Sequence, residues 1–375
     1  MSKHPSDGLE ASLVEDVYPL SPVQLGIVFH DLYSPGSGAY VGQYVFSLRG
    51  SVDPGVLRQA WQHVLDLHSV LRTAFVCSGM EQPVQVVFRR AILPWETLDW
   101  RDRSPDERRE KLRLFLEAQS RQAFDLLRPP LMRLALIRTG DEDFELVWSY
   151  HHVLLDGWSL SLVLQDVLLS YDALLRRRRP TLPRRNPYRD YITWLQRQDL
   201  AEAEGYWRGV LGGFAGPTPL PVPGGPLAGE AVPGEVGLLL PEAATAALQA
   251  LGKRRRLTLN TLVQGAWALL LARWAGEDDV VFGAVVTGRP LELAGMERML
   301  GLFINPLPVR VQVEPGARVD EWLARLQAAQ QVSRSYEFSP LAEVQRWSGA
   351  PGGRALFESI VAFQNHPVEE MAGAE

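Results

Sequence analysis

Hydrophobic positions alternate with polar ones in some stretches of the chain and recur at helical spacing in others. Residues 39–49 are rich in β-branched and aromatic side chains, with the large ones at even spacing: Tyr40, Tyr44, Phe46 and Leu48. Even spacing places side chains on one face of an extended chain, so this stretch predicts a strand.

A helix is expected directly after this strand. Asp53 is a favourable N-cap and Pro54 fits the first helical position. Apolar side chains then follow at helical spacing: Val56, Ala60, Val64 and Leu67. Residues 68–76 return to a strand pattern, so the pattern predicts a strand, helix and strand in succession.

Residues 130–140 and 144–152 read as two strands of a hairpin, because a turn-forming sequence separates them. A helix is predicted beyond Gly157, with Ser159 as its N-cap. Its apolar positions alternate three and four residues apart: Leu160, Val163, Leu164, Val167, Leu168, Tyr171 and Leu175. The strand that ends in two histidines therefore leads directly into an amphipathic helix.

The arginine run at residues 176–179 is followed by Pro180 and a second proline-broken basic stretch. We interpret the run as a solvated helix end favoured by the helix dipole, and the stretch as a connection between two halves. One amphipathic helix is predicted at residues 188–210. Residues 212–234 are mostly Gly and Pro, which predicts a surface loop.

The second half repeats this alternation of strands and helices. Strands are predicted at residues 235–240, 279–286, 302–313 and 357–365, and helices at 241–253, 258–274 and 319–332. The pattern predicts a mixed α/β (α+β) chain in two halves.

Length and composition exclude several classes of protein. The chain has 375 residues, enough for two or three domains or for one fold of two similar lobes. Its formal charge of −6 provides no overall attraction for nucleic acid. The single cysteine, Cys77, is expected in a core and allows no internal disulfide. Because we find neither a signal peptide nor an apolar run of membrane-spanning length, we expect a cytoplasmic protein without membrane contact.

Residues 151–158 contain the most informative local sequence. Adjacent strand side chains point to opposite faces, so His151 and His152 are not expected to bind one metal ion. His152 shares its face with Leu146, Trp148 and Tyr150, a row that ends at the turn into the next helix. Asp156 and Gly157 lie in this turn, which is where a scaffold can present a reactive group.

Other kinds of site have weaker support. Ser159 heads an amphipathic helix and lacks the second glycine of a nucleophile elbow. The chain has no phosphate-binding loop, no GxGxxG after a strand and no cysteine pair for zinc. His30, His63 and His68 are expected on helix surfaces or ends. No metal site is predicted.

The segment HHVLLDG at residues 151–157 resembles the HHxxxDG signature of the chloramphenicol-acetyltransferase-like acyltransferases. The whole chain resembles the condensation domains of nonribosomal peptide synthetases. Six further segments resemble motifs of that family, in the family's order: residues 18–30, 68–75, 188–199, 286–290, 301–309 and 361–367.

The resemblance implies two acetyltransferase-like lobes arranged in a V, with mixed sheets flanked by helices. Residues 1–180 would form the N-terminal lobe with the HHxxxDG motif, and residues 181–375 the C-terminal lobe. Family members continue beyond the last motif, so we expect the second lobe to be truncated at its C-terminal end. Pro306 stands where the family usually has threonine.

The implied activity is peptide-bond formation between a donor aminoacyl or peptidyl thioester and an acceptor aminoacyl thioester. Both are carried on 4'-phosphopantetheine arms by peptidyl carrier proteins, and the domain itself binds no cofactor. The expected partners are an upstream donor carrier, a downstream acceptor carrier and an adenylation domain of one larger synthetase, in which this domain is a monomer. Such synthetases make antibiotics, siderophores and other secondary metabolites.

The sequence around the motif resembles the class that joins an L-donor to an L-acceptor. An epimerisation-type relative and a non-catalytic carrier-binding platform are the alternatives. The resemblance assigns His152 as general base or amine-positioning group and His151 as a structural residue. It pairs Asp156 with Arg289, places the Gly157 N–H near the thioester, and places Trp158 and Asn305 along the substrate tunnel.

Overall fold

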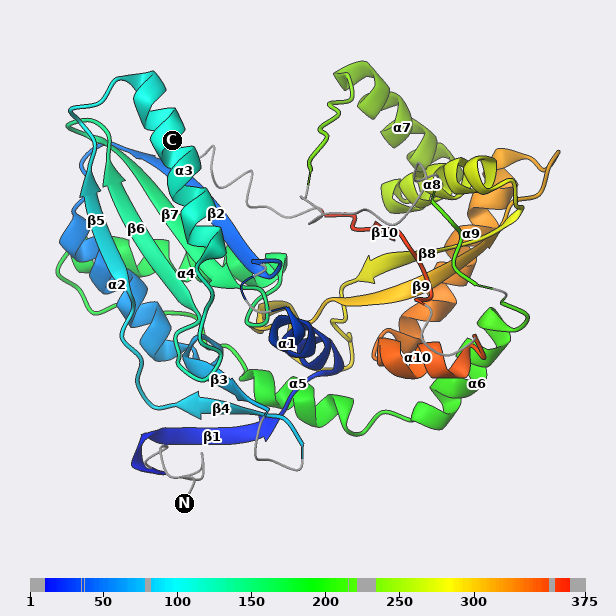
Figure 1. Cartoon of the computed structure of the whole chain (residues 1–375), viewed down its shortest axis with the longest axis horizontal. Coiled ribbons are helices and arrows are strands. Elements are labelled where there is room, and N and C mark those ends of the chain that lie inside the picture. Colours follow the sequence, from blue (N-terminus) through cyan, green and yellow to red (C-terminus); the bar gives the residue numbers. More distant parts are fainter. Residues whose placement is uncertain are drawn as a thin grey trace. The chain divides into compact units, whose positions relative to one another are not determined.

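The structure is a computed structural model that describes residues 11–34, 36, 38–77, 82–214, 216–220, 234–350 and 355–364. The described chain divides into two compact units (Figure 1). The first holds the chain up to Gln198 together with Arg289–Ile304, and the second holds Asp199–Gly288 with Asn305–Gln364. Arg289–Ile304 therefore belongs to the first unit although both of its neighbours in sequence belong to the second.

A four-stranded sheet forms the centre of the first unit. Its strands are β2 (Val41–Arg49), β5 (Trp95–Asp99), β6 (Met132–Arg138) and β7 (Asp143–His151), in the order β2-β7-β6-β5. β7 pairs antiparallel with both β2 and β6, and β5 pairs parallel with β6. The strand predicted at residues 39–49 and the hairpin predicted at 130–152 are both confirmed.

A smaller sheet of the first unit has the order β1-β4-β3, with β1 at Val14–Pro19, β3 at Thr73–Val76 and β4 at Val84–Phe88. Two 3-10 turns, η2 (Ala11–Leu13) and η3 (Ser69–Arg72), precede β1 and β3. The strand predicted at residues 68–76 is therefore only half right, because η3 occupies its first part.

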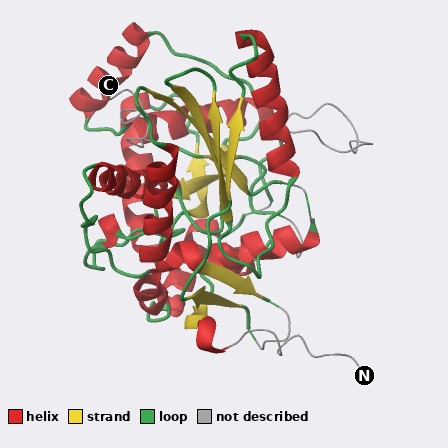
Figure 2. Ribbon diagram, turned by 90° about the vertical axis from the view of Figure 1, so that its left-hand side faces the viewer, coloured by secondary structure: helices red, strands yellow, loops and turns green. Residues whose placement is uncertain are grey.

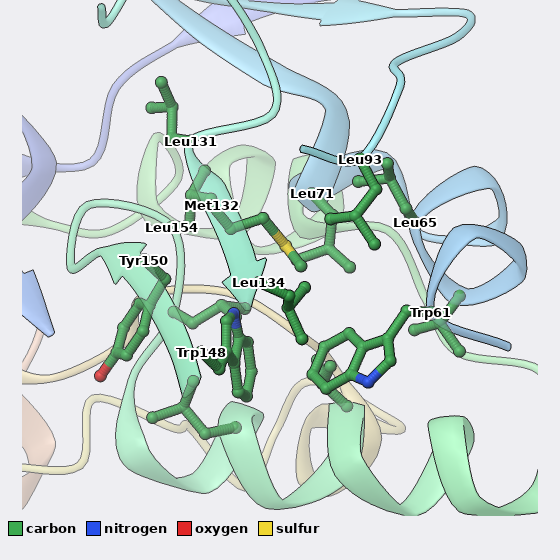
Figure 3. Packing of buried hydrophobic residues seen from close by; sticks show 14 of the residues in the cluster. Trp61, Leu65, Leu71, Leu93, Leu131, Met132, Leu134, Trp148, Tyr150 and Leu154 are labelled. Atoms are coloured by element: carbon green, nitrogen blue, oxygen red, sulfur yellow. The ribbon is translucent and has the colours of Figure 1, made fainter. Parts of the chain in front are cut away.

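Five helices flank these sheets: α1 (Pro22–Tyr33), α2 (Pro54–Leu67), α3 (Pro105–Arg121), α4 (Gly157–Leu175) and α5 (Tyr188–Leu195). α2 and α4 cover one face of the large sheet, where Trp61 packs against Trp148 in the main core (Figure 3). α3 covers the other face through Phe115 and its neighbours. The large sheet is therefore the middle layer of three.

The predicted capping of α2 is confirmed, since the Asp53 carboxylate accepts hydrogen bonds from the Gly55 and Val56 N–H groups. The face of α2 that packs into the core is slightly rotated about the helix axis from the predicted one. The residues that α2 buries are Leu57, Ala60, Trp61, Val64 and Leu65, whereas Leu67 is 49% exposed.

α4 is the one helix among the described residues whose length and apolar composition would allow it to cross a membrane. Its buried side includes Asp166, which is fully buried, hydrogen-bonds to the His68 ring and forms an ion pair with Arg185. A buried ion-paired carboxylate is typical of a helix packed in a protein core. His68 ends α2, as predicted, but it is buried rather than on the surface.

The helix predicted at residues 188–210 is wrong as a single element. α5 ends at Leu195 and α6 (Leu200–Leu211) begins after Asp199, whose carboxylate caps the new helix. α5, which lies beyond the predicted lobe boundary at residue 180, belongs to the first unit, and α6 belongs to the second. An N-cap within a periodic pattern is the local signal for this break.

The second unit contains a three-stranded sheet of order β10-β8-β9, labelled in Figure 1. The view turned by 90° shows the chain's strands with helices on either side (Figure 2). β8 (Asp279–Val286) pairs antiparallel with β9 (Asn305–Gln312) and parallel with β10 (Ile360–Val361). The helices after α6 are α7 (Glu242–Arg255), α8 (Leu259–Ala275), α9 (Val319–Ser333) and α10 (Leu341–Trp347). Two 3-10 turns complete the described elements: η4 (Met296–Arg298), in the first unit, and η5 (Arg334–Tyr336).

Three predictions for the second half need correction. Residues 235–240 form no strand, and Val236 and Leu239 are almost fully exposed, because no described strand pairs with this segment. The strand predicted at 302–313 begins only at Asn305, since the preceding residues belong to the first unit. The strand predicted at 357–365 is reduced to Ile360–Val361.

Some predicted features lie outside the described residues. They are most of the loop at 212–234, namely residue 215 and residues 221–233, and the end of the last motif, residues 365–367. Cys77 is half-buried beside the main core rather than fully within it, and burial raises the pKa of its thiol.

Candidate active site at the turn between β7 and α4

The predicted row of side chains on one face of β7 is present. The ring centroids of Trp148 and Tyr150 lie 5.4 Å apart, and those of Tyr150 and His152 lie 6.2 Å apart. His151 lies on the other face, where its ring contacts Tyr40 and Phe124. The two histidines therefore have separate environments, as strand geometry requires.

His151 is almost completely buried, and its Nδ1 accepts a hydrogen bond from the Val153 N–H at 3.2 Å. An Nδ1 acceptor places the proton of the neutral ring on Nε2, which lies 3.8 Å from the Asp31 carboxylate. Burial lowers the pKa of His151 to about 4, and the nearby Asp31 carboxylate opposes this shift only in part. His151 is therefore neutral at physiological pH, which suits a structural residue.

His152 is half-buried at the start of the turn. Its backbone N–H donates to the Tyr40 carbonyl at 2.8 Å, which continues the pairing of β2 with β7 by one residue. Its side-chain Nδ1 is buried and has no hydrogen-bond partner among the described residues. The backbone of His152 is therefore held by a hydrogen bond, whereas the Nδ1 of its ring is not used in one.

Asp156, rather than Ser159, is the N-cap of α4, which corrects the sequence prediction. Its Oδ1 accepts the Ser159 N–H at 2.8 Å. Its Oδ2 accepts the Phe303 N–H at 3.3 Å, and its own N–H donates to the Gly301 carbonyl at 3.0 Å. One nearly fully buried carboxylate therefore fixes both the helix start and the segment around Gly301.

Arg289 lies beside Asp156 and forms an ion pair with it, at 3.0 Å between Nη2 and Oδ1. Nη1 donates to the carbonyls of Met296 and Met299, and the guanidinium lies 4.1 Å from the centre of the Phe303 ring. Burial lowers the pKa of Arg289, although Asp156 favours its charged form. Arg289 thus connects the turn with the segment Arg289–Ile304.

Ser159 makes contacts that sequence reasoning missed. Its Oγ donates to the Gly301 carbonyl at 2.8 Å and accepts from the Gly301 N–H and from Arg289 Nη2. Position 301 must be a glycine, because a Cβ there would lie 2.1 Å from the Tyr188 ring. The motif at residues 301–309 was the signal for Gly301, but nothing local indicated its partners.

Gly157 begins α4, and its N–H has no acceptor among the described residues, as is usual in a first helical turn. Trp158 is 40% exposed, and its indole N–H donates to the Glu297 carbonyl at 2.9 Å. The structure therefore brings His151, His152, Asp156, Gly157, Trp158 and Arg289 together in the first unit.

Asn305 belongs to the second unit, where it begins β9 and is buried. Its side-chain amide donates to the carbonyls of Glu337 and Ser339, both at 2.8 Å. Its Oδ1 is buried without a partner among the described residues. The contacts shown for Asn305 are structural, and its place along a tunnel stays a prediction.

Metal-ligand groups and one cavity were compared with this site within the described residues. Among the described residues, no three His, Cys, Asp or Glu side chains are grouped as a metal site requires. A cavity of about 230 Å³ lies on the α3 face of the large sheet, lined in part by Phe115, Arg133 and Ser149. None of the predicted site residues lines this cavity.

Residues 14–375 match the family model described as "Condensation domain". The chain belongs to the condensation domain family. This membership confirms the resemblance carried by the motifs, and it places the chain among the amide-bond-forming enzymes of nonribosomal peptide synthesis.

The curated relatives are much longer proteins. The chain is 48% identical over 358 residues to a component of the linear gramicidin synthase of Brevibacillus parabrevis, covering 94% of this chain and 7% of that protein. It is 36% identical over 362 residues to surfactin synthase subunit 3 of Bacillus subtilis, covering 96% of this chain and 28% of that protein. The chain thus spans less than a tenth of the gramicidin synthase component and under a third of the surfactin one.

Solved structures share the fold. The starter condensation domain of rhizomide synthetase RzmA, in complex with C8-CoA, has a TM-score of 0.76 at 24% identity, covering 92% of this chain and 78% of that one. The first condensation domain of the calcium-dependent antibiotic synthetase has a TM-score of 0.77 at 20% identity, covering 94% and 82%. The predicted chloramphenicol-acetyltransferase-like fold, with mixed sheets flanked by helices, is confirmed.

Proposed function

We propose that this chain catalyses peptide-bond formation between two thioester-bound substrates, an aminoacyl or peptidyl donor and an aminoacyl acceptor. The observation that carries the proposal is the position of His152, whose half-buried imidazole ends the β7 row beside a rigidly held helix start. The expected chemistry needs one group to take a proton and a scaffold to hold that group.

In the reaction, the acceptor amine attacks the donor thioester carbonyl and forms a C–N bond. The amine loses a proton, the C–S bond breaks, and the donor carrier leaves as a thiolate that takes up a proton. His152 receives the amine proton or orients the amine. We assign this contact to Nε2, because Nδ1 is buried. His151 has no part in this transfer, since it is buried and neutral.

Asp156 and Arg289 do not contact the substrates in this proposal, but position the groups that do. Their ion pair fixes the first turn of α4 and therefore the direction of the Gly157 N–H. That N–H has no acceptor within the described chain, so it is available to a thioester oxygen. Trp158 and Asn305 are proposed to line the path of the substrates.

The substrates arrive on 4'-phosphopantetheine arms of an upstream donor carrier and a downstream acceptor carrier, beside an adenylation domain of the same synthetase. We propose the type that joins an L-donor to an L-acceptor, acting in the cytoplasm. The family membership and the length of the synthase relatives support this multidomain setting.

The test is a condensation assay with two carrier proteins, each loaded with a synthetic phosphopantetheine thioester, and products read by intact-protein mass spectrometry. The assay compares His152→Ala with wild type. His151→Asn, at the neighbouring residue, is the control variant. Loss of a general base lowers the rate by about 100-fold or more, so His152→Ala should lose at least that much at an unchanged melting temperature. His151→Asn should lose stability more than rate.

Three outcomes contradict the proposal. An active His152→Ala variant would exclude the role of the imidazole. Carrier binding by wild type without any amide product would identify a non-catalytic platform. Inversion of the donor's α-carbon without amide formation would identify an epimerisation-type enzyme.

A further inference from the structure

Tyr150 is an aromatic neighbour of His152 in the first unit. Their ring centroids are 6.2 Å apart with an interplanar angle of 42°. Tyr150 pairs with Gly42 of β2, and two residues further along the chain the His152 N–H donates to the Tyr40 carbonyl. The two side chains therefore occupy successive positions on one face, at the end of the sheet where α4 begins.

Gly42 provides the space for the Tyr150 phenol. A Cβ at position 42 would lie 2.5 Å from Tyr150 Cζ and 2.7 Å from the hydroxyl oxygen. The ring therefore leans across β2, which is the outer strand of the sheet. Figure 3 shows the hydroxyl directed away from Trp148 and from the rest of the core cluster.

The Tyr150 hydroxyl makes no hydrogen bond with another described residue, and its oxygen is not among the fully buried polar atoms. Two other tyrosines of the same unit are bonded: the Tyr188 hydroxyl donates to the Leu302 carbonyl, and the Tyr171 hydroxyl accepts the Asp53 N–H. Tyr150 as a whole is only 4% exposed, and tyrosine hydroxyls in such positions usually find a partner. An unpaired hydroxyl beside His152 whose oxygen is not fully buried is therefore available to a substrate.

The phenol is also in the correct protonation state to donate. Burial raises the pKa of Tyr150, and the neighbouring Tyr44 and Asp156 raise it further. The hydroxyl therefore keeps its proton throughout the pH range in which an amine attacks a thioester. A neutral donor held by packing can stabilise charge that develops on an oxygen without giving up its proton.

We propose that the Tyr150 hydroxyl donates a hydrogen bond to the carbonyl oxygen of the donor thioester, which becomes negatively charged as the amine attacks. This inference rests on the proposed function and assigns a second substrate contact to that site. The proton stays on the phenol throughout, while the amine proton leaves through His152 as described above.

The test compares Tyr150→Phe with Tyr44→Phe in the carrier-loaded condensation assay. Tyr44 stacks on Tyr150 with centroids 6.3 Å apart, lies on the same face and has no hydrogen bond within the described residues, so it is a matched control. Removing one oxyanion donor costs about 100-fold in rate, so kcat should fall by about 10-fold to 100-fold in Tyr150→Phe. In Tyr44→Phe, kcat should stay within twofold of wild type.

A role in packing would affect different quantities. In Tyr150→Phe, we expect the KM, the melting temperature and the midpoint of the acidic limb of the kcat/KM pH profile to stay as in wild type. A kcat within twofold of wild type overturns the proposal. A shifted acidic midpoint also overturns it, because the phenol would then act through His152.

Failure of this inference can be distinguished from failure of the proposed function. If wild type forms product and His152→Ala does not, a fully active Tyr150→Phe rejects only the phenol's role. If wild type forms no product with loaded carriers, both proposals are rejected.

Discussion

Asp156 and Arg289 are 133 residues apart in the chain, and Nη2 of the arginine donates to both carboxylate oxygens, at 3.0 and 3.1 Å. The same carboxylate caps α4 and holds the backbone at Phe303. The ion pair therefore joins the turn between β7 and α4 to a segment that returns to the first unit from the second half of the sequence.

Breaking this ion pair should destabilise the turn between β7 and α4. Asp156→Asn retains an N-cap side chain but leaves Arg289 buried without its carboxylate. Loss of one partner of a buried ion pair costs about 3 kcal/mol or more, so the melting temperature should fall markedly and activity with it. A double-mutant cycle with Arg289→Met, read by urea unfolding, should give a coupling energy of about 1–3 kcal/mol. Purely additive effects would show that the pair contributes little.

His151 should make stability depend on pH. Its pKa is about 4 in the folded protein, below its ordinary value of 6.5. Between these values the unfolded chain binds more protons, so stability falls as the pH is lowered from 6.5 towards 4, by at most about 3 kcal/mol. The measurement is the urea midpoint at pH 7.5, 6.0 and 5.0 for wild type and His151→Asn. The difference between the two proteins should shrink as the pH falls, and parallel curves would contradict the assignment.

Ser159 should be needed to hold the segment around Gly301. In Ser159→Ala, the hydrogen bond that Oγ donates to the Gly301 carbonyl and the two that it accepts from the Gly301 N–H and Arg289 Nη2 are lost in a fully buried place. An unsatisfied buried group costs about 1–3 kcal/mol, which should appear in the melting temperature. Ser161→Ala is the control, because Ser161 Oγ makes a single 3.5 Å contact with the Gly157 carbonyl. Equal losses in both variants would exclude a special role for Ser159.

Asn305 should stabilise the second unit. Asn305→Ala removes both donors to the Glu337 and Ser339 carbonyls, and we expect a loss of about 2 kcal/mol in unfolding free energy. If the role is structural alone, kcat measured well below the melting temperature should stay near that of wild type. A large loss of kcat in a folded variant would instead support contact with the substrates.

Local patterns predicted the elements near the site well. The strand β2, the Asp53 cap and the start of α4 after the histidines are encoded within a few residues, because they depend on side-chain periodicity and capping. The predicted apolar face of α4 is only partly right, since Leu168 and Leu175 are about half exposed. The sequence predictions failed where contacts with distant parts of the chain decide the structure. Residues 235–240 have a strand-like composition but no described partner strand, and the helix predicted at 188–210 is divided at Asp199 between two units.

By itself, the sequence determined the two-histidine motif, its place between a strand and a helix, and membership of the condensation domain family. Only the tertiary structure decided which groups surround the motif. Ser159 bonds its hydroxyl to Gly301, and Tyr150 occupies the space above Gly42 on a neighbouring strand. These contacts join residues more than a hundred positions apart. Their existence depends on how the chain folds back on itself, which no local spacing specifies.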